Sequence, residues 1–511
     1  MPINFIPNDP LAGSTSPMRQ VTARPDRAAN RAGFNFVNAV PQGLFNPGTP
    51  GFLFWQCREA ALAAIETWES INGNLLRWGR ATPNATRLNL KQDDGDDLNA
   101  FYDGQSLSFF HHTTGTKTTF SAASTDVVAH EAGHGLLDSV RPPLFDSAIT
   151  EHGAFHEAFG DCMALLTGFS DQKTRQAVLA ASPNLGQANF LEATAEDLSD
   201  AVKRALGPTH PAAAPRHALN NFRFQLPTTL PTTGGPAVLT REIHSFGRVF
   251  SGCFYDTVRN IFNSLPNRNE AALLKAAQTA GKLLIAGAKN APMTARFFQA
   301  VGRAMVLEDQ AKNNGANRQA ITDAFTRHNI ALGSNAMLEP RATLAGAAPK
   351  MSGAKGILSA ATVKDLRNRI EAKPGSKIVM GMLEIGGEKV AEAVHQRPVS
   401  LTGLDSRLKG VVAMAAEPVL VKSAGGMSAL VSALPDPSTS EDEVQAFVET
   451  LLAHNRIAFD GKDTKPPKRR AGALGMVAAR DELLQLPTHK ITTSGGKKVL
   501  KRIRYLCLHT D

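Results

Sequence analysis

The chain has 511 residues, of which 42% are apolar and 20% are charged, as is typical of a soluble globular protein. This length exceeds that of one ordinary domain, so we expect two or three domains. The net charge of +9 is uneven: residues 341–511 carry 26 Lys and Arg against 17 Asp and Glu, whereas the first 340 residues carry 29 of each. Any attraction to polyanions is therefore expected in the C-terminal third.

Targeting signals and disulfides are not indicated by the sequence. The N-terminal stretch "MPINFIPNDPLAGSTSPMRQ" has no basic segment followed by an apolar run, and the most apolar stretch, 411–434, is interrupted by Glu417 and Lys422. The four cysteines lie far apart without a CxxC pair, so we expect reduced, mostly buried thiols. They are Cys57, Cys162, Cys253 and Cys507. We expect a cytoplasmic protein, or one exported by a route that needs no signal peptide.

The order of patterns along the chain predicts five segments. Residues 1–50 are rich in Pro, Gly and Asn without periodicity, which predicts an extended arm. Residues 51–170 combine helices with short strands, and residues 171–335 are mostly helical. A linker rich in Ala, Gly and Pro follows at 336–355. Residues 356–511 form a basic accessory domain whose fold the pattern does not define.

Several helices and strands are predicted in chain order. Apolar residues at helical spacing predict a buried helix from Phe52 to Trp78, and "LNAFYDGQSLSFF" predicts two short strands joined at Asp103-Gly104. Further helices are expected from about Asp126 to Ser139, from Gly153 to Gly168 and from near His244. The last helices are expected at 270–332 and around 441–454.

One stretch of the predicted 126–139 helix carries a possible metal motif. "DVVAHEAGHGLLD" contains His130, Glu131 and His134 in the order His-Glu-x-x-His. Positions i and i+4 share one face of a helix, so both histidines can reach one metal ion, and Glu131 can act as a general base beside it. An amphipathic helix with two surface histidines fits these five residues equally well.

A third ligand is needed for a zinc site, and two glutamates lie at a suitable distance along the chain. Glu157 lies within the next predicted helix, in "GAFHEAFGD", and Asp161 follows it one turn later on the same face. Glu151 is expected in the connecting loop and is aimed less rigidly. We therefore favour Glu157 as the ligand and Asp161 as a carboxylate that orients a ligating imidazole.

Four motifs in order resemble the thermolysin family of zinc endopeptidases over roughly residues 50–335. They are "NAFY" at 99–102, "DVVAHEAGHGLLD" at 126–138, "GAFHEAFGD" at 153–161 and "REIHSFGRVF" at 241–250. The resemblance implies an α+β fold with two lobes: a mixed N-terminal lobe with an edge strand and the His-Glu-x-x-His helix, and a helical C-terminal lobe. The basic C-terminal domain, of unknown fold, would be appended to this unit.

The resemblance also implies roles for the metal-site residues. His130, His134 and Glu157 would hold zinc, and Asp161 would steady His130. Glu131 would deprotonate a zinc-bound water, which then attacks the scissile carbonyl of a peptide substrate.

Substrate contacts are implied in the same way. Asn99 and the backbone of Ala100 would bind the main chain of the substrate as an added strand. His244 would stabilise the oxyanion alongside zinc. Arg216 precedes His244 by 28 residues, which matches the family's spacing for the arginine that binds a substrate carbonyl. The alternative for Arg216 is an ordinary surface arginine.

The sequence departs from the family pattern near the site. His156 and Gly160 stand where the family has Asn and Ser, and Ala148 stands where it has a tyrosine. The carboxylate that supports the later histidine is missing from its usual position, and Glu242 is a possible substitute. His152 is the loop histidine that we expect nearest to the cleft.

Calcium is not expected. After Asp161 the chain runs "CMALLTGFSDQKT", where the family's calcium-binding carboxylates would stand. Asp126 matches one calcium-binding position of the family, but we interpret it as a helix-capping residue.

The basic C-terminal region allows two interpretations. From Lys462 to Arg504 there are twelve Lys and Arg against three acidic residues, including "KPPKRR" and "KKVLKRIR". Binding to nucleic acid or to an acidic partner is possible. We favour a solvated basic face, because few aromatic residues lie among the charges.

The sequence therefore predicts a zinc-dependent endopeptidase with a peptide or protein substrate and no membrane partner. An aminopeptidase is less favoured, because no Gly-x-Met-Glu-Asn element is present to bind a free amino terminus. The alternative from another class is a non-catalytic binding or toxin-scaffold protein that keeps the gluzincin frame. The presence of Glu131 argues against this alternative, since a binding protein needs no general base.

Overall fold

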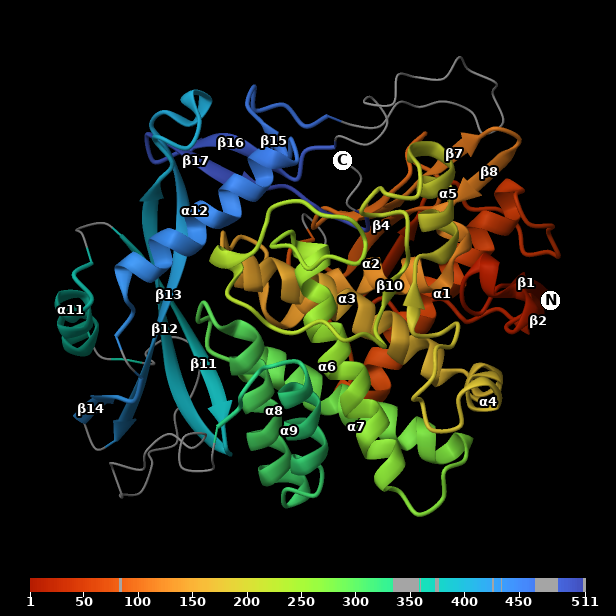
Figure 1. The fold of residues 1–511 in the computed structure, drawn as a ribbon, viewed down its shortest axis with the longest axis horizontal. Helices are drawn as coiled ribbons and strands as arrows, with labels where there is room; N and C mark the ends of the chain where they lie inside the picture. Colours follow the sequence, from red (N-terminus) through yellow and green to blue (C-terminus); the bar gives the residue numbers. More distant parts are fainter. Residues whose placement is uncertain are drawn as a thin grey trace.

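The structure is a computed structural model that describes residues 1–81, 85–333, 358, 360–372, 376–424, 427–432, 434–464 and 486–508. Helices and several β-sheets are combined in it, so the predicted mixture of α and β structure is confirmed (Figure 1). None of the described helices is long and apolar enough to cross a lipid bilayer.

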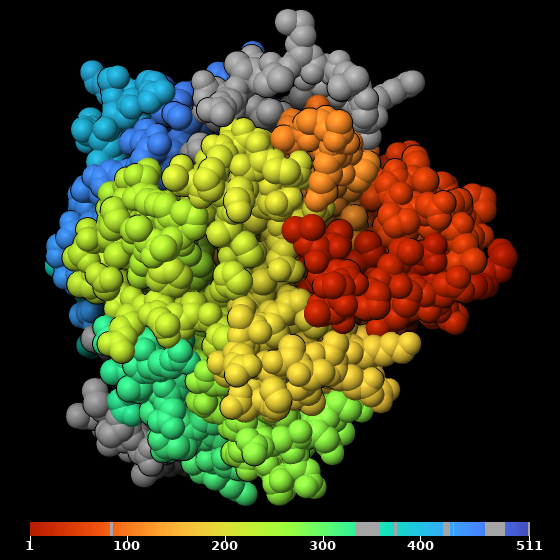
Figure 2. All heavy atoms as spheres, turned by 45° about the vertical axis from the view of Figure 1, so that its right-hand side comes forward, coloured from red at the N-terminus to blue at the C-terminus, as the bar shows by residue number. Residues whose placement is uncertain are grey.

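The first fifty residues contain strands. β1 (Pro2–Phe5) pairs antiparallel with β2 (Arg19–Thr22), and Ile3 is fully buried. Figure 2 shows this segment, in red, lying against the yellow part of the chain, where Arg19 forms an ion pair with Asp171. The segment expected to be an extended arm is thus packed against the rest of the molecule.

A mixed sheet with the strand order β18-β5-β6-β4-β3 joins distant parts of the sequence. Its strands are β3 (Gly33–Phe36), β4 (Arg87–Lys91), β5 (Ala100–Tyr102), β6 (Ser106–Phe109) and β18 (Tyr505–Leu506). Strands β3, β4 and β6 run parallel, whereas β5 is antiparallel to both of its neighbours. The predicted turn at Asp103-Gly104 joins β5 to β6, and the edge beyond β5 is occupied by a strand from the C-terminal region.

Three helices that cross the middle of the molecule carry most of the chemistry. They are α2 (Thr125–Val140), α3 (Thr150–Ser170) and α6 (Ile243–Ser264). α2 ends where Pro142 and Pro143 follow, because proline cannot continue a helix. A Cβ atom on Gly133 of α2 would lie 2.9 Å from the Cα atom of Gly160 of α3, so this pair of glycines lets the two backbones approach closely.

The remaining helices surround this centre. α1 (Pro50–Asn72) confirms the buried helix predicted from Phe52, but it ends at Asn72 and not at Trp78 as predicted. The helical pattern predicted at 270–332 is confirmed. The others in the first two thirds of the chain are α4 (Gln172–Ala181), α5 (Glu196–Leu206), α7 (Glu270–Asn290), α8 (Phe297–Asn313) and α9 (Arg318–Arg327). Two short strand pairs complete this part: β7 (His111–Thr114) with β8 (Lys117–Phe120), and β9 (Ala193–Thr194) with β10 (Arg216–His217).

The C-terminal part forms a second, larger sheet with the order β11-β12-β13-β17-β16-β15, and β14 pairs with β13. Its strands are β11 (Lys377–Ile385), β12 (Glu388–Ser400), β13 (Val411–Ala424), β14 (Met427–Leu430), β15 (Ile457–Ala458), β16 (His489–Ser494) and β17 (Lys497–Arg502). Its helices are α11 (Ala360–Arg369) and α12 (Pro437–Ala453), and α12 corresponds to the helix predicted around 441–454.

The C-terminal sheet packs against the central helices through apolar and polar contacts. Leu383 and Ile385 of β11 belong to the same apolar core as the central helices. Ile149, next to α3, lies in a smaller core with Phe447 of α12. The buried Arg141 also pairs with Glu392 of β12 at 2.6 Å.

Candidate active site

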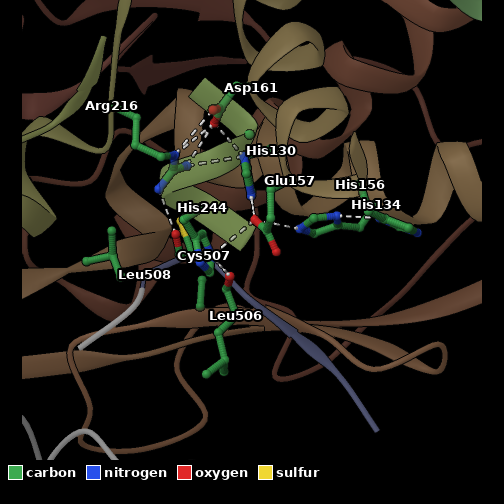
Figure 3. Close-up of polar contacts among 12 residues, drawn as sticks. His130, His134, His156, Glu157, Asp161, Arg216, His244, Leu506, Cys507 and Leu508 are labelled. Atoms are coloured by element: carbon green, nitrogen blue, oxygen red, sulfur yellow. Dashed lines mark hydrogen bonds and ion pairs between the residues drawn. The ribbon is translucent and has the colours of Figure 1, made fainter. Parts of the chain in front are cut away.

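The two motif histidines and Glu157 point toward one another in the buried interior (Figure 3). His130 and His134 lie one turn apart on α2, and Glu157 faces them from α3. Oε2 of Glu157 lies 3.3 Å from Nε2 of His130 and 3.7 Å from Nε2 of His134. One ligand atom from each residue lies within 4.8 Å of the other two, so this group could hold one metal ion.

The atoms that face this centre are unusual because they are buried without hydrogen bonds. Nε2 of His130, Nε2 of His134 and both carboxylate oxygens of Glu157 have no hydrogen-bond partner in the part of the chain that the structure describes. Buried polar atoms are almost always paired, so such a group indicates a missing ligand. Two imidazole nitrogens and a carboxylate oxygen are a donor set that fits zinc.

Asp161 orients His130 from the next turn of α3. Its Oδ1 atom lies 3.0 Å from Nδ1 of His130, and Nη2 of Arg216 donates to the same carboxylate at 2.8 Å. Burial opposes the charged form, but Arg216 and His130 lower the pKa of Asp161 to about 2. The carboxylate therefore accepts the Nδ1 proton of His130 and leaves Nε2 free for a metal. A Cβ atom at Gly160 would lie 2.7 Å from Nδ1 of His130, so glycine makes room for this ring.

His134 is oriented by a residue that the sequence analysis did not assign to the site. Nδ1 of His156 lies 2.8 Å from Nδ1 of His134. Burial lowers the pKa of His134 to about 3 and holds that of His156 well below its usual value, so both rings are neutral and one donates to the other. His156 directly precedes Glu157, and this adjacency to a proposed ligand is the signal that could have identified it.

Glu131 lies beside the candidate metal group. Its side chain is fully buried, and neither carboxylate oxygen has a hydrogen-bond partner among the residues described. Burial raises the pKa of Glu131 to about 8. A cation held by the neighbouring ligands would lower this pKa, because an adjacent positive charge favours the carboxylate. The arrangement suits a residue that takes up and returns a proton.

His244 reaches the centre from the first turn of α6, supported by Glu242. The Glu242 carboxylate caps the helix by accepting from the backbone N–H of His244 at 3.0 Å, and its Oε1 atom lies 2.8 Å from Nδ1 of the same residue. Burial disfavours the charged ring, but Glu157 and Glu242 raise the pKa of His244 to about 10. Glu242 thus occupies the supporting position for which the sequence suggested it.

The edge strand β5 already binds a peptide main chain, and that chain belongs to the protein itself. The backbone N–H of Cys507 donates to the carbonyl oxygen of Ala100 at 2.9 Å. The Asn99 side chain accepts from the Leu508 N–H at 3.0 Å and donates to the Leu508 carbonyl at 3.2 Å. Asn99 and Ala100 therefore make the contacts that were predicted for a substrate, here with residues that follow β18.

Arg216 and His244 bind carbonyl groups of the same segment. Nη1 of Arg216 donates to the carbonyl oxygen of Cys507 at 2.7 Å, and Nε2 of His244 lies 2.6 Å from that of Leu506 (Figure 3). Arg216 is buried, in contrast to the alternative of a surface arginine. The sequence predicts Cys507 only as a buried thiol, because no local motif places it at the site.

Other candidates lie outside the metal group. The Glu151 carboxylate accepts from Arg296 at 2.5 Å and from the backbone N–H of Phe298 at 3.0 Å. The ring of His152 lies 2.6 Å from Ser147 Oγ and 3.0 Å from the carbonyl oxygen of Thr294. Neither residue faces the centre formed by the two motif histidines.

Asp126 stabilises the start of α2. Its Oδ1 atom accepts from the backbone N–H of Val127 at 2.7 Å, and its Oδ2 atom accepts from that of Ala195 at 2.9 Å. The N-cap position itself is Ser124, so Asp126 acts from the first turn of the helix.

The basic C-terminal run is described only in part. Residues 465–485, which include "KPPKRR", lie outside the described residues. Four basic residues that follow them line a cavity of about 1260 Å³, together with Arg80 and Arg397. These four are Lys490, Lys497, Lys501 and Arg502. Both interpretations of this region, the favoured solvated basic face and the less favoured site for nucleic acid or an acidic partner, stay predictions.

A buried group of two imidazoles and one carboxylate, with a free glutamate beside it, is the kind of site found in metal-dependent hydrolases. Residues 79–138 match the family model of the thermolysin metallopeptidase catalytic domain, so this part of the chain is a thermolysin-like metallopeptidase segment. The match includes Asn99 and the His130–His134 motif and ends before Glu157. A comparison with curated proteins found no match.

Proposed function

We propose that the protein is a zinc-dependent endopeptidase with the two-lobed arrangement of the thermolysin family. The observation that carries this proposal is the convergence of His130, His134 and Glu157, whose buried facing atoms lack hydrogen-bond partners in the described chain. The match of residues 79–138 to the thermolysin catalytic domain supports the same class of reaction. In this arrangement β5 and α2 belong to one lobe and the helices from α6 onward to the other.

In the proposed reaction zinc would be held by His130, His134 and Glu157. When bound, it would supply a Lewis acid that polarises the scissile carbonyl and makes water more acidic. Glu131 would accept a proton from the attacking water and pass it to the leaving amine. His244, positively charged beside Glu157, would donate a hydrogen bond to the developing oxyanion.

The contacts for the substrate backbone come from the edge of the β5 sheet. Asn99 and the Ala100 carbonyl would align the substrate as an antiparallel strand, and Arg216 would hold one of its carbonyls. Main-chain recognition of this kind requires an extended peptide and does not require a free terminus. It therefore supports an endopeptidase acting on peptides or unfolded protein segments.

The proposal is tested by Glu131→Gln, with Glu66→Gln as a matched control on the exposed side of α1. We expect Glu131→Gln to keep stoichiometric zinc but to lose about 10²–10⁴-fold in cleavage of a quenched peptide library. The control should match the parent. Because residues 506–508 lie against the site, each protein is assayed with and without the additional Cys507→Ser substitution.

Two results would count against the proposal. Full cleavage by Glu131→Gln would show that another group acts as the base. No chelator-sensitive cleavage by any of the proteins, with zinc bound, would favour the non-catalytic binding protein instead.

A further inference from the structure

Residues 506–508, the end of β18 and the two residues after it, occupy the groups that a substrate would need. Their backbone contacts Asn99 and Ala100 on one side, while Arg216 and His244 bind two of their consecutive carbonyl oxygens. Because these contacts involve only main-chain atoms of residues 506–508, they are the contacts that an unrelated extended peptide would also form. A substrate strand and this segment cannot be bound at the same time.

The side chain of Cys507 extends this contact to the metal group. Its sulfur lies within 4.8 Å of a ring nitrogen of His130 and a carboxylate oxygen of Glu131. Cys507 is fully buried and forms no disulfide. The sulfur therefore lies beside His130, one of the proposed zinc ligands, and beside Glu131, the proposed base.

The preceding residues hold the segment in place. The Tyr505 ring stacks on His156 with ring centroids 4.1 Å apart and on His134 at 4.9 Å. The Arg502 guanidinium lies 4.1 Å from the centroid of the same ring, and that of Arg504 lies 4.7 Å from the centroid of Phe101. Pairing of β18 with β5 holds the backbone of the same segment in place.

We propose that Cys507 is the fourth zinc ligand of a latent form of the enzyme, in which residues 505–508 fill the cleft as a substrate-like strand. This inference rests on the proposed function, because it needs zinc at His130, His134 and Glu157. A thiolate suits zinc as a ligand, and together with His130, His134 and Glu157 it would supply the four donors that zinc prefers. The open position needed for catalysis is then closed, and the enzyme becomes active only when the strand leaves.

The proton balance of this closure involves Glu131. Cys507 binds zinc as the thiolate, so its S–H bond breaks and the sulfur keeps the electron pair. Glu131, the adjacent carboxylate with two unpaired oxygens, takes up the proton. When the strand leaves, the proton returns to sulfur, the zinc position opens and Glu131 is restored as the base.

The metal-ligand part is tested without any assay of activity. Zinc is replaced by Co²⁺ in the full chain, in Cys507→Ser and in Cys57→Ser, which alters a buried thiol of α1. A thiolate bound to Co²⁺ gives an intense charge-transfer band in the near ultraviolet. We expect this band in the parent and in Cys57→Ser and expect it to be absent from Cys507→Ser. Its absence from the parent would overturn the assignment.

The latency part is tested by releasing the strand. Cys507→Ser removes the thiolate, and Leu508→Pro removes the N–H that Asn99 accepts. Each should raise cleavage of a quenched peptide by about ten-fold or more, because an intramolecular occupant acts at a high effective concentration. A peptide of the sequence RYLCL should inhibit the released enzymes, and RYLSL should inhibit them more weakly. Equal activity of parent and variants would overturn the latency.

The outcomes separate this inference from the proposed function. If the parent is fully active and lacks the Co²⁺ band, the endopeptidase function stands and the assignment of Cys507 as a ligand is refuted. If the parent shows the band but no released variant cleaves peptide, the assignment of Cys507 as a ligand stands and the endopeptidase function is refuted. Mass spectrometry adds one further outcome, because spontaneous cleavage between Leu506 and Cys507 would make the strand a substrate and refute the latency.

Discussion

Helix α3 carries two buried glutamates whose hydrogen bonding differs. At its first turn, Glu151 accepts hydrogen bonds from Arg296 and from the backbone of Phe298. Two turns later, Glu157 faces only histidines, and its oxygens have no hydrogen-bond partner in the described residues. Both side chains are almost completely buried, so burial alone does not distinguish a ligand from a structural carboxylate.

The difference lies in which cation is available. Arg296 and the backbone amide of Phe298 each bond one oxygen of Glu151, so both oxygens already have a partner. Near Glu157, Arg216 contacts His130 of the motif, and its guanidinium is bound to Asp161 at 2.8 Å. Arginine therefore pairs with Asp161, the carboxylate that orients His130. The oxygens of Glu157 stay available for a metal ion, as a ligand requires.

The largest expected effect compares the two glutamates directly. Glu157→Gln should lower zinc affinity by about 10³-fold or more. Loss of a residue that only orients a ligand already lowers metal affinity by about 10–100-fold, and loss of a ligand should cost more. Glu151→Gln should retain stoichiometric zinc. Metal analysis after dialysis against a competing chelator measures both. Retention of zinc by Glu157→Gln would show that Glu157 is not a ligand. Loss of zinc from Glu151→Gln would show that Glu151 is one.

A second prediction concerns pH and Glu151. Burial raises the pKa of Glu151 to about 7 in the folded protein, above its ordinary value of 4.5. Between these pH values the unfolded chain has released the proton that the folded protein still holds. The free energy of unfolding should therefore fall as the pH rises from 4.5 to 7, by about 3 kcal/mol in total.

Denaturant unfolding at several pH values measures this effect, with Glu151→Gln as the variant that removes the titrating group. The variant should show a flatter dependence over the same interval. A parent whose stability rises with pH through this interval, with the variant unchanged, would show that Arg296 keeps Glu151 ionised.

The smallest expected effect concerns the ring that orients His134. His156→Phe removes the partner of Nδ1 and should lower zinc affinity by about 10–100-fold. His156→Asn keeps a hydrogen-bond acceptor at this position and should stay close to the parent. The same chelator competition measures both variants, and equal losses would mean that the packing against Tyr505 matters more than the hydrogen bond.

Local periodicity explains why much of the candidate site could be predicted. His130 and His134 share a helical face at any position in a fold, and so do Glu157 and Asp161. Glu242 could be suggested because it lies two residues from His244. His156 was overlooked because its role depends on how α3 crosses α2, where Gly133 and Gly160 bring the helices together.

The sequence by itself determined the donor set, because ligand residues spaced along helices are placed by hydrogen bonds within each helix. Only the tertiary structure decided which segment pairs with the edge of β5 beside this group. The pairing of β18 with β5 joins Tyr505 to Tyr102 across most of the chain, and no local pattern specifies such a partner. Strand pairing is set by packing and by the unpaired edge of β5, so the position of Cys507 at the metal group emerges only when the whole chain has folded.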